Sequence, residues 1–384
     1  MRCGEPGREC PSGLTCDDNG ICKAAGMAGN CAPLVDAFEQ IDAPFDAFVP
    51  GQICHGMFFR TCVDTEPADR VFTTGTVTIN TNDTTNCTLV QPQAQLPMVC
   101  VIAGRDIMIP QGTTVRVHGQ LPVAFYATRT LLIAGTVDVS SNVLGNKGAG
   151  GNTGTCSVAA PGNPGASASG GAGGGAGGAF IGEGGGGGAG AGGFLGGMTT
   201  PEVPGPGLKQ VRGGCPGARG GNVDTATGGT GGQGGGAVHF MAIGNIQLTD
   251  SAVINASGAG GSQSDPRTGG GGGGSGGFIG FSSPSFTVSA VARVYAIGGG
   301  GSAGGGISVK GDAGAEAIGP ADTTMRLGFE GGGAGARGTA GAGEGGTGGT
   351  MNGGGGGGGG GGGLIGFEGG SFTGGAVQPA PRPL

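Results

Sequence analysis

Long runs of glycine constrain this chain more than any other feature of its sequence. Glycine accounts for 103 of the 384 residues, and residues 353–363 are an unbroken run of it. Glycine has no side chain to bury, and the chain offers only 16 Phe, 2 Tyr and no Trp for a core. Because folding depends on burying apolar side chains against the cost in conformational entropy, one large globular enzyme core is not expected.

The glycine-rich tracts cover residues 146–236, 258–277 and 298–384. They lack the strict Gly-X-Y period and the proline content of collagen. Two interpretations remain: a low-complexity insertion without order, or extended polyglycine II-like helices that pack side by side. Ordered packing is favoured because the tracts contain apolar positions that a flexible linker does not need, namely Phe180, Ile181, Phe194, Leu195, Leu364, Ile365 and Phe367.

Between the tracts, apolar residues alternate with period two and the pattern repeats. Ile107-x-Ile109, five residues and Val115-x-Val117-x-Gly119 form one instance. The same spacing recurs from Ile246 and from Phe286, and a version with a shorter turn starts at Leu131. Alternation of this kind predicts short strands with one buried face. Repeats that cannot close a core alone are expected to stack.

The sequence therefore predicts an all-β fold: a parallel β-solenoid with packed or inserted glycine-rich tracts and a small N-terminal disulfide-rich module. A barrel or sandwich also uses short strands, but it does not require the same side chains at the same offsets. The expected divisions are a module at 1–24, a linker with one short helix at 25–70, solenoid coils at 71–145, a glycine-rich insertion at 146–234, further coils at 235–300 and a glycine-rich tract at 301–384.

The N-terminal module is defined by its cysteines. Four of them lie within twenty residues that contain few apolar side chains, at Cys3, Cys10, Cys16 and Cys22. Such a segment needs covalent links to fold, so two disulfides are expected. A zinc site is the alternative, but the spacing is too wide and no histidine is near. Disulfides imply export, although the chain begins without the features of a signal peptide.

Composition and motifs also limit the partners. The net charge of −7 argues against nucleic acid, and no apolar run is long enough to cross a membrane;. No phosphate-binding loop signature of the P-loop type occurs. We expect no cofactor and no metal, since the one calcium-like stretch, at 220–224, does not repeat;.

Candidate catalytic residues were sought among the histidines and carboxylates. His118 and His239 alternate with apolar residues, so both are expected on the outer surface. Asp106, Asp138 and Asp250 fall on different edges of the aligned repeats and do not form the pair that glycoside hydrolysis requires. Aligning the first two repeats places Arg116 beside Asp138, which indicates an ion pair between neighbouring coils. No catalytic residue is predicted.

Three glycines, Gly119, Gly258 and Gly298, end three of the repeats at the same offset. We expect structural turns there, with a positive φ that glycine adopts without strain.

The chain resembles the glycine-rich secreted or surface-anchored proteins that large-genome soil bacteria encode in multiple copies. The segment Cys10-Pro-Ser-Gly-Leu-Thr-Cys16-Asp-Asp-Asn-Gly-Ile-Cys22 resembles their cysteine-rich module, and the stretches at 234–242 and around 275 resemble their strand beginnings. A weaker resemblance, in composition only, is to the PGRS-type proteins. The resemblance implies an extracellular or cell-surface location and brings no catalytic residue.

The expected function is therefore structural or adhesive, at the cell surface or in an extracellular matrix, without catalysis. Cell-surface or matrix components and glycans are the expected partners. The alternatives are a polysaccharide-active β-helix enzyme and a non-catalytic carbohydrate-binding adhesin. For the adhesin, Tyr126 and Tyr295 are the candidate outward aromatic platforms.

Overall fold

The computed structural model describes two compact units, Met1–Pro50 and Gly51–Leu384. The described residues are 14–16, 22–24 and 51–384, with the exception of 94–97, 144–145, 153–155, 157, 164, 166–169, 203–209, 318, 321–326, 329 and 371–373. In the first unit they form two antiparallel strands, β1 (Leu14–Cys16) and β2 (Cys22–Ala24). Residues 25–50 of the linker that was expected to contain one short helix lie outside the described residues, as do the side chains of the four module cysteines.

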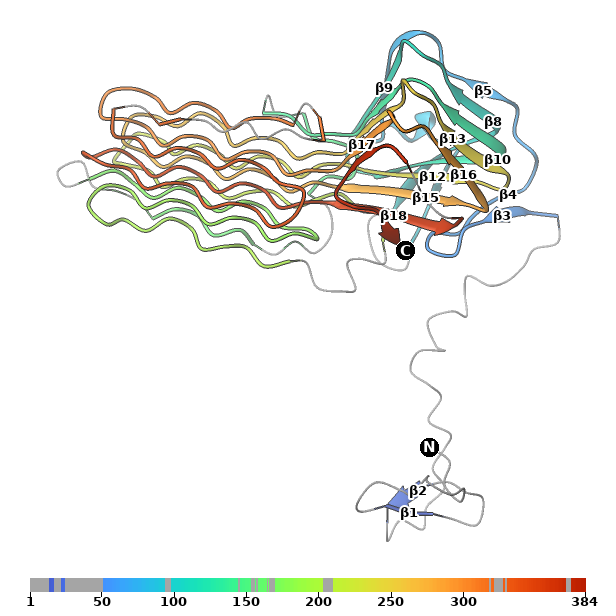
Figure 1. Ribbon diagram of the computed structural model, residues 1–384, viewed down its shortest axis with the longest axis horizontal. Coiled ribbons are helices and arrows are strands. Elements are labelled where there is room, and N and C mark those ends of the chain that lie inside the picture. Colours follow the sequence, from blue (N-terminus) through green and yellow to red (C-terminus); the bar gives the residue numbers. More distant parts are fainter. Residues whose placement is uncertain are drawn as a thin grey trace. The chain divides into compact units, whose positions relative to one another are not determined.

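The second unit contains two long, mainly parallel sheets (Figure 1). The first consists of β5 (Arg70–Val71), β7 (Leu89–Gln91), β8 (Val99–Ile109), β10 (Val123–Ile133), β12 (Ala237–Ala242), β13 (Asn245–Leu248), β15 (Phe278–Ser283), β16 (Ser285–Val288), β18 (Leu364–Gly369) and β20 (Arg382–Pro383). The second consists of β6 (Gly75–Asn80), β9 (Thr113–His118), β11 (Thr136–Asp138), β14 (Val253–Asn255), β17 (Arg293–Tyr295) and β19 (Ala376–Gln378). The described part of the chain has no α-helix and only one 3₁₀ turn, Thr84–Asn86. The all-β prediction is confirmed.

The strand register follows the spacing of the sequence repeats. Leu131 of β10 lies between Ile107 of β8 and Ile246 of β13, and Phe286 of β16 follows Ile246. In the second sheet the equivalent column is Val77, Val115, Val137, Ile254, Val294 and Val377. Parallel strands in register bring equivalent side chains together, so these columns form the buried core between the sheets;.

Aromatic side chains form a further column in the first sheet. The rings of Phe125, Phe240 and Phe281 stack, with centroids 5.6 Å and then 5.4 Å apart. Offset stacking of this kind adds to the stabilisation from burial. The repeats also continue beyond those visible in the sequence: β6 precedes them, and β18 and β19 follow within the range expected to be glycine-rich.

The described parts of the glycine-rich segments between 148 and 236, 256 and 277, and 296 and 363 leave the sheets and run side by side (Figure 1). They are called the glycine bundle here. Its central segments are 170–180, 267–277 and 353–363, which hydrogen-bond to one another. For example, the amide of Gly175 donates to the carbonyl of Gly270 at 2.8 Å, and the amide of Gly273 donates to the carbonyl of Gly358 at 2.9 Å. The glycine bundle is thus held by backbone hydrogen bonds between segments distant in the sequence.

The bonds of segment 353–363 follow a period of three. Gly354, Gly357 and Gly360 donate to segment 296–306, the next residue of each triplet donates to segment 170–180, and the third donates to segment 341–347. Its carbonyls accept from three further segments, 333–339, 270–276 and 182–191. A chain with three residues per turn presents every third residue in one direction. The segment is therefore enclosed on all sides.

This enclosure explains the unbroken glycine run. A Cβ atom at any position of 353–363 would lie 1.8–2.2 Å from a backbone atom of a neighbouring segment. Real Cβ atoms do not approach so closely, and backbone cannot move aside as a flexible side chain can;. Only glycine fits there.

An antiparallel hairpin covers part of the first sheet. It consists of β3 (Ile53–His55) and β4 (Thr61–Val63), joined by the Cys54–Cys62 disulfide. Two further disulfides link Cys87 to Cys100 and Cys156 to Cys215. Three disulfides indicate that the protein folds in an oxidising environment.

Candidate functional site

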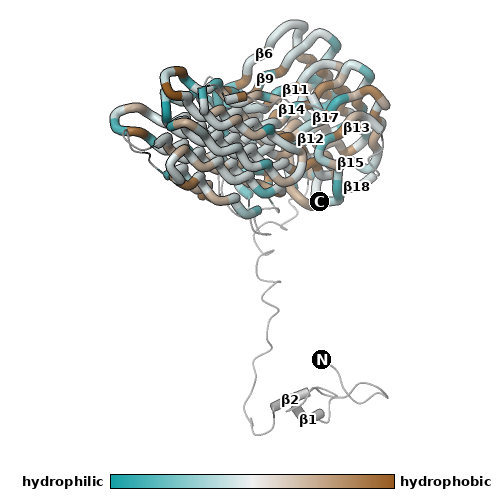
Figure 2. Tube along the Cα trace, turned by 60° about the vertical axis from the view of Figure 1, so that its left-hand side comes forward, coloured by the Kyte–Doolittle hydropathy of each residue, from teal (hydrophilic) through white to brown (hydrophobic). Residues whose placement is uncertain are grey.

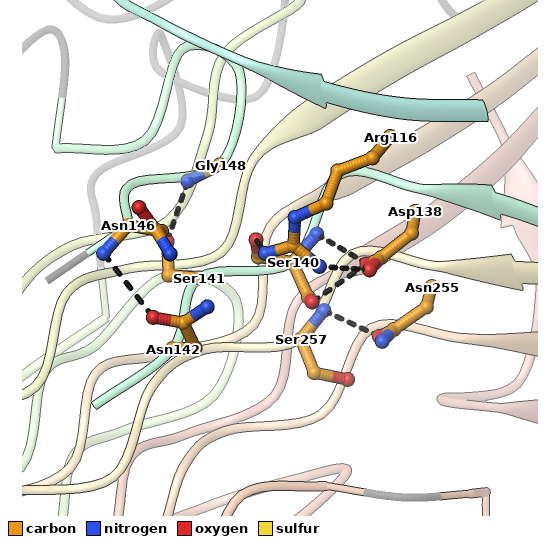
Figure 3. A network of polar contacts seen from close by, with 9 residues as sticks. All are labelled: Arg116, Asp138, Ser140, Ser141, Asn142, Asn146, Gly148, Asn255 and Ser257. Carbon is orange, nitrogen blue, oxygen red and sulfur yellow. Dashed lines mark hydrogen bonds and ion pairs between the residues drawn. The ribbon is translucent and has the colours of Figure 1, made fainter. Parts of the chain in front are cut away.

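Asp138 and Arg116 lie opposite each other on β11 and β9, as the repeat alignment predicts, and form an ion pair (Figure 3). The other carboxylate oxygen of Asp138 accepts hydrogen bonds from the backbone amide of Ser140 at 3.0 Å and from its hydroxyl at 2.6 Å. Both oxygens are thus engaged in fixing the chain where it enters the glycine bundle. Asn255 makes the equivalent bond to the amide of Ser257 one strand further on (Figure 3).

The other two carboxylates have similar roles between neighbouring strands. Asp106 accepts from the amide and hydroxyl of Thr130 and forms an ion pair with Arg129 at 2.8 Å. Asp250 accepts from the hydroxyl of Ser289. Asp106 belongs to β8, Asp138 to β11, and Asp250 to the turn after β13, so the fold gathers no pair of them into one site.

The prediction for His239 is wrong. Its side chain points away from the core between the two sheets, but it is fully buried, because the rings of Phe58 and Phe59 cover it. The Phe278 ring packs beside it, with the ring centroids 5.9 Å apart. Neither ring nitrogen has a hydrogen-bond partner among the described residues. Burial, with a smaller effect from His55, lowers the pKa of His239 to about 3. The alternating pattern could not reveal a cover that comes from residues far away in the sequence.

The two tyrosines expected as sugar-binding platforms are also buried. Tyr126 has no exposed surface and donates its hydroxyl to the carbonyl of Ile53 at 2.9 Å, and Tyr295 is 5% exposed. Neither ring offers a flat face to a sugar.

A cleft lined by several polar side chains lies where the β3–β4 hairpin meets the carboxyl ends of β15 and β18. It has a volume of about 550 Å³, and its lining includes His55, Arg60, Ser282 and Glu368. No feature of the sequence pointed to it, since these residues come together only through the hairpin. A histidine, a serine and a carboxylate are also the residue types of a nucleophilic catalytic site, so their geometry decides whether the cleft could catalyse a reaction.

That geometry favours a structural role. His55 Nε2 lies 3.1 Å from the carbonyl oxygen of Ser282 and 3.2 Å from its hydroxyl. A carbonyl only accepts, so Nε2 carries the proton and cannot take one from the serine. The Glu368 carboxylate accepts from the backbone amides of Met57 and Phe58, which holds the hairpin tip in place.

A second unusual cluster surrounds Arg212, which is fully buried. Its guanidinium lies 5.1 Å from the ring centre of Phe180, and one of its nitrogens is 3.1–3.2 Å from both sulfurs of the Cys156–Cys215 disulfide. Burial lowers the pKa of Arg212 to about 10, so it remains charged at neutral pH. The cluster connects two segments at the base of the glycine bundle.

The predicted turn glycines divide into two kinds. Gly119 has φ of 125°, as expected, and a Cβ there would lie 2.4 Å from the Thr81 hydroxyl. Gly258 and Gly298 do not have positive φ. They are glycine because they enter the glycine bundle, where a Cβ would lie 2.2 Å and 2.0 Å from the carbonyls of Gly274 and Gly360.

The outer segments of the glycine bundle are less tightly enclosed at some positions. In segment 343–350, a Cβ on Gly345 or Gly348 would meet nothing closer than 3.2 Å, whereas one on Gly343, Gly346 or Gly349 would lie 2.2–2.3 Å from a backbone atom. Elsewhere in the bundle, Leu195 and Met198 are 65% and 79% exposed. On the segments 227–236 and 256–265 the exposed residues are polar, and Thr227 bonds Asp265. Figure 2 shows that most of the bundle lies near the middle of the hydropathy scale.

Within the residues that the structure describes, no group of three or more metal-ligating side chains gathers. A search of the same residues for a helix long and apolar enough to span a membrane finds none. No protein family, curated protein or solved structure matches the chain.

Proposed function

We propose that the protein is a structural or adhesive component of the cell surface or extracellular matrix and has no catalytic activity. The stacked strands would form a β-solenoid, and the glycine bundle a rigid polyglycine II-like extension of it. The observation that carries the proposal is the enclosure of segment 353–363, which hydrogen-bonds to neighbours in every direction. A backbone packed this densely resists bending and presents a fixed surface.

The disulfides support the proposed location. Three of them lie in the second unit, and covalent links of this number are typical of exported proteins;. The resemblance to secreted glycine-rich proteins agrees with this location. The net charge of −7 suits contact with cell-surface or matrix components and glycans more than with nucleic acid;.

A polysaccharide-active enzyme is the alternative from another class. The bonds of Asp106, Asp138 and Asp250 to neighbouring strands favour the structural role over it. A carbohydrate-binding adhesin without catalysis remains compatible with the proposal, but burial of Tyr126 and Tyr295 removes its expected platforms.

Two measurements test the proposal on the full chain. Protease treatment of intact native cells should remove the protein if it lies at the surface, whereas protection until lysis would contradict that location. A glycan panel should show no hydrolysis, with or without binding. Turnover that is abolished by Asp138→Ala or Asp250→Ala would replace the proposal with the enzyme.

A further inference from the structure

The tip of the β3–β4 hairpin, residues 56–60, is called the cap loop here. It lies over β12 and β15 and buries His239 beneath Phe58 and Phe59. Phe58 also stacks on Phe278, with ring centroids 5.5 Å apart. Gly280 lies opposite His239 on β15, and a Cβ there would be 2.6 Å from Phe278 and 3.0 Å from the His239 ring. The site is therefore shaped around an uncharged imidazole among aromatic rings.

Few polar contacts hold the cap loop and its hairpin to the sheet. Glu368 accepts from the amides of Met57 and Phe58, and His55 bonds to Ser282. Tyr126 donates to the carbonyl of Ile53, and Gln91 donates to the carbonyl of Arg60. Met57, at the tip, is 85% exposed. The Cys54–Cys62 disulfide keeps the hairpin intact whether or not its tip is docked. The loop can therefore leave the sheet without unfolding the strands below it.

We propose that the cap loop is an acid-sensitive latch, closed over neutral His239 and released when that imidazole takes up a proton. A protonated imidazole has two N–H donors, and the closed site offers neither of them an acceptor among the described residues;. An unpaired charge among phenylalanine rings is strongly unfavourable, whereas water solvates it once the loop opens. Opening would uncover Phe278, on which Phe58 stacks, in the apolar outer face of the sheet.

The groups around His239 either disfavour its protonation or make their hydrogen bonds to other residues. From the hairpin, His55 disfavours a positive charge on His239. Glu368, from β18, already accepts two backbone amides, and the hydroxyl of Tyr126, from β10, donates to Ile53. None of these contacts supplies His239 with an acceptor.

The pH range follows from the sign of the pKa change. An exposed histidine titrates near 6.5, whereas closure lowers the pKa of His239 to about 3. Because closure lowers this pKa, neutral His239 stabilises the closed loop fully above pH 6.5. This stabilisation is lost as the pH falls from 6.5 toward 3. The ratio of open to closed loop should rise about tenfold for each pH unit in this range.

Hydrogen exchange of the Met57 and Phe58 amides in the full chain tests the latch. After correction for intrinsic exchange, their protection should fall at least about tenfold between pH 7 and pH 4.5. His239→Phe, which cannot titrate, should abolish this fall, while the matched control His118→Phe should retain it. Glu368→Gln should lower protection by the same factor at both pH values.

Protection of segment 353–363 reports whether each variant is folded, and His239→Gln replaces His239→Phe if the latter is not. Equal protection of Met57 and Phe58 at both pH values in the parent would overturn the proposal. The same fall in the parent and in the folded His239 variant would overturn it as well.

Discussion

Arg116 of β9 and Asp138 of β11 face each other across neighbouring parallel strands and form an ion pair that is partly open to solvent. Their side chains are 28% and 16% exposed, respectively, so water screens part of the attraction. The contact shows that the repeats stack in the register given by their spacing. It also occupies a carboxylate that would otherwise be a catalytic candidate.

We expect this pair to contribute little to stability. In a double-mutant cycle with Arg116→Met and Asp138→Asn, the coupling energy should be below about 1 kcal/mol, as for other partly exposed pairs. Urea denaturation of the parent, both single variants and the double variant measures it. A coupling of several kcal/mol would show that the pair is a major determinant of strand register.

Asp265 should make stability dependent on pH under acidic conditions. The backbone amide of Thr227, followed by Lys310 and the Thr227 hydroxyl, lowers the pKa of Asp265 from 3.8 to about 2. A lowered carboxyl pKa stabilises the fold above about 4, and this contribution disappears as the pH falls toward 2. The Tm of the parent should therefore exceed that of Asp265→Asn at pH 6, and the difference should shrink by pH 2. A constant difference would contradict the assignment.

The Cys156–Cys215 disulfide should be a major support of the bundle base. It joins residues 59 apart in sequence, so replacing both cysteines with serine should cost about 2–5 kcal/mol;. Chemical denaturation of the variant measures the loss. Replacement of Cys54 and Cys62, which are only 8 apart, is the matched comparison and should cost less;. The reverse order would mean that loop length does not govern these effects.

The oxidised state itself can be counted. Thiol labelling of denatured protein from its native compartment should reveal at least six more cysteines after reduction than before, because three disulfides are present. Nearly complete labelling without reductant would contradict an oxidising compartment.

The sequence predicted the features that depend on local spacing. Alternation identified the strands, and identical offsets identified the register that places Ile107, Leu131 and Ile246 side by side. β6 lies within the coils expected at 71–145, but β18 and β19 were not predicted, because their flanking residues break the common spacing. The cap over His239 was also missed, since it depends on a contact between residues 58–59 and 239, which no local pattern encodes.

Glycine illustrates the same limit. A positive φ was expected at Gly119, Gly258 and Gly298, and only Gly119 has one. Composition alone cannot separate a glycine needed for backbone conformation from one needed for close packing. Gly258→Val should still destabilise the fold, by about 1–3 kcal/mol or more, but because its side chain would overlap the carbonyl of Gly274;.

The most direct test of the account compares valine at two glycines of the bundle. At Gly357 a Cβ would lie 2.0 Å from the carbonyl of Gly271, whereas at Gly341 it would meet nothing within 4 Å. Thermal melts of Gly357→Val and Gly341→Val should be recorded beside the parent. If segment 353–363 is enclosed, Gly357→Val should lower the Tm by at least about 3 °C, corresponding to a loss of about 2–3 kcal/mol. Gly341→Val should leave the Tm nearly unchanged. An unchanged Tm for Gly357→Val would contradict the packed bundle on which the proposed structural function depends.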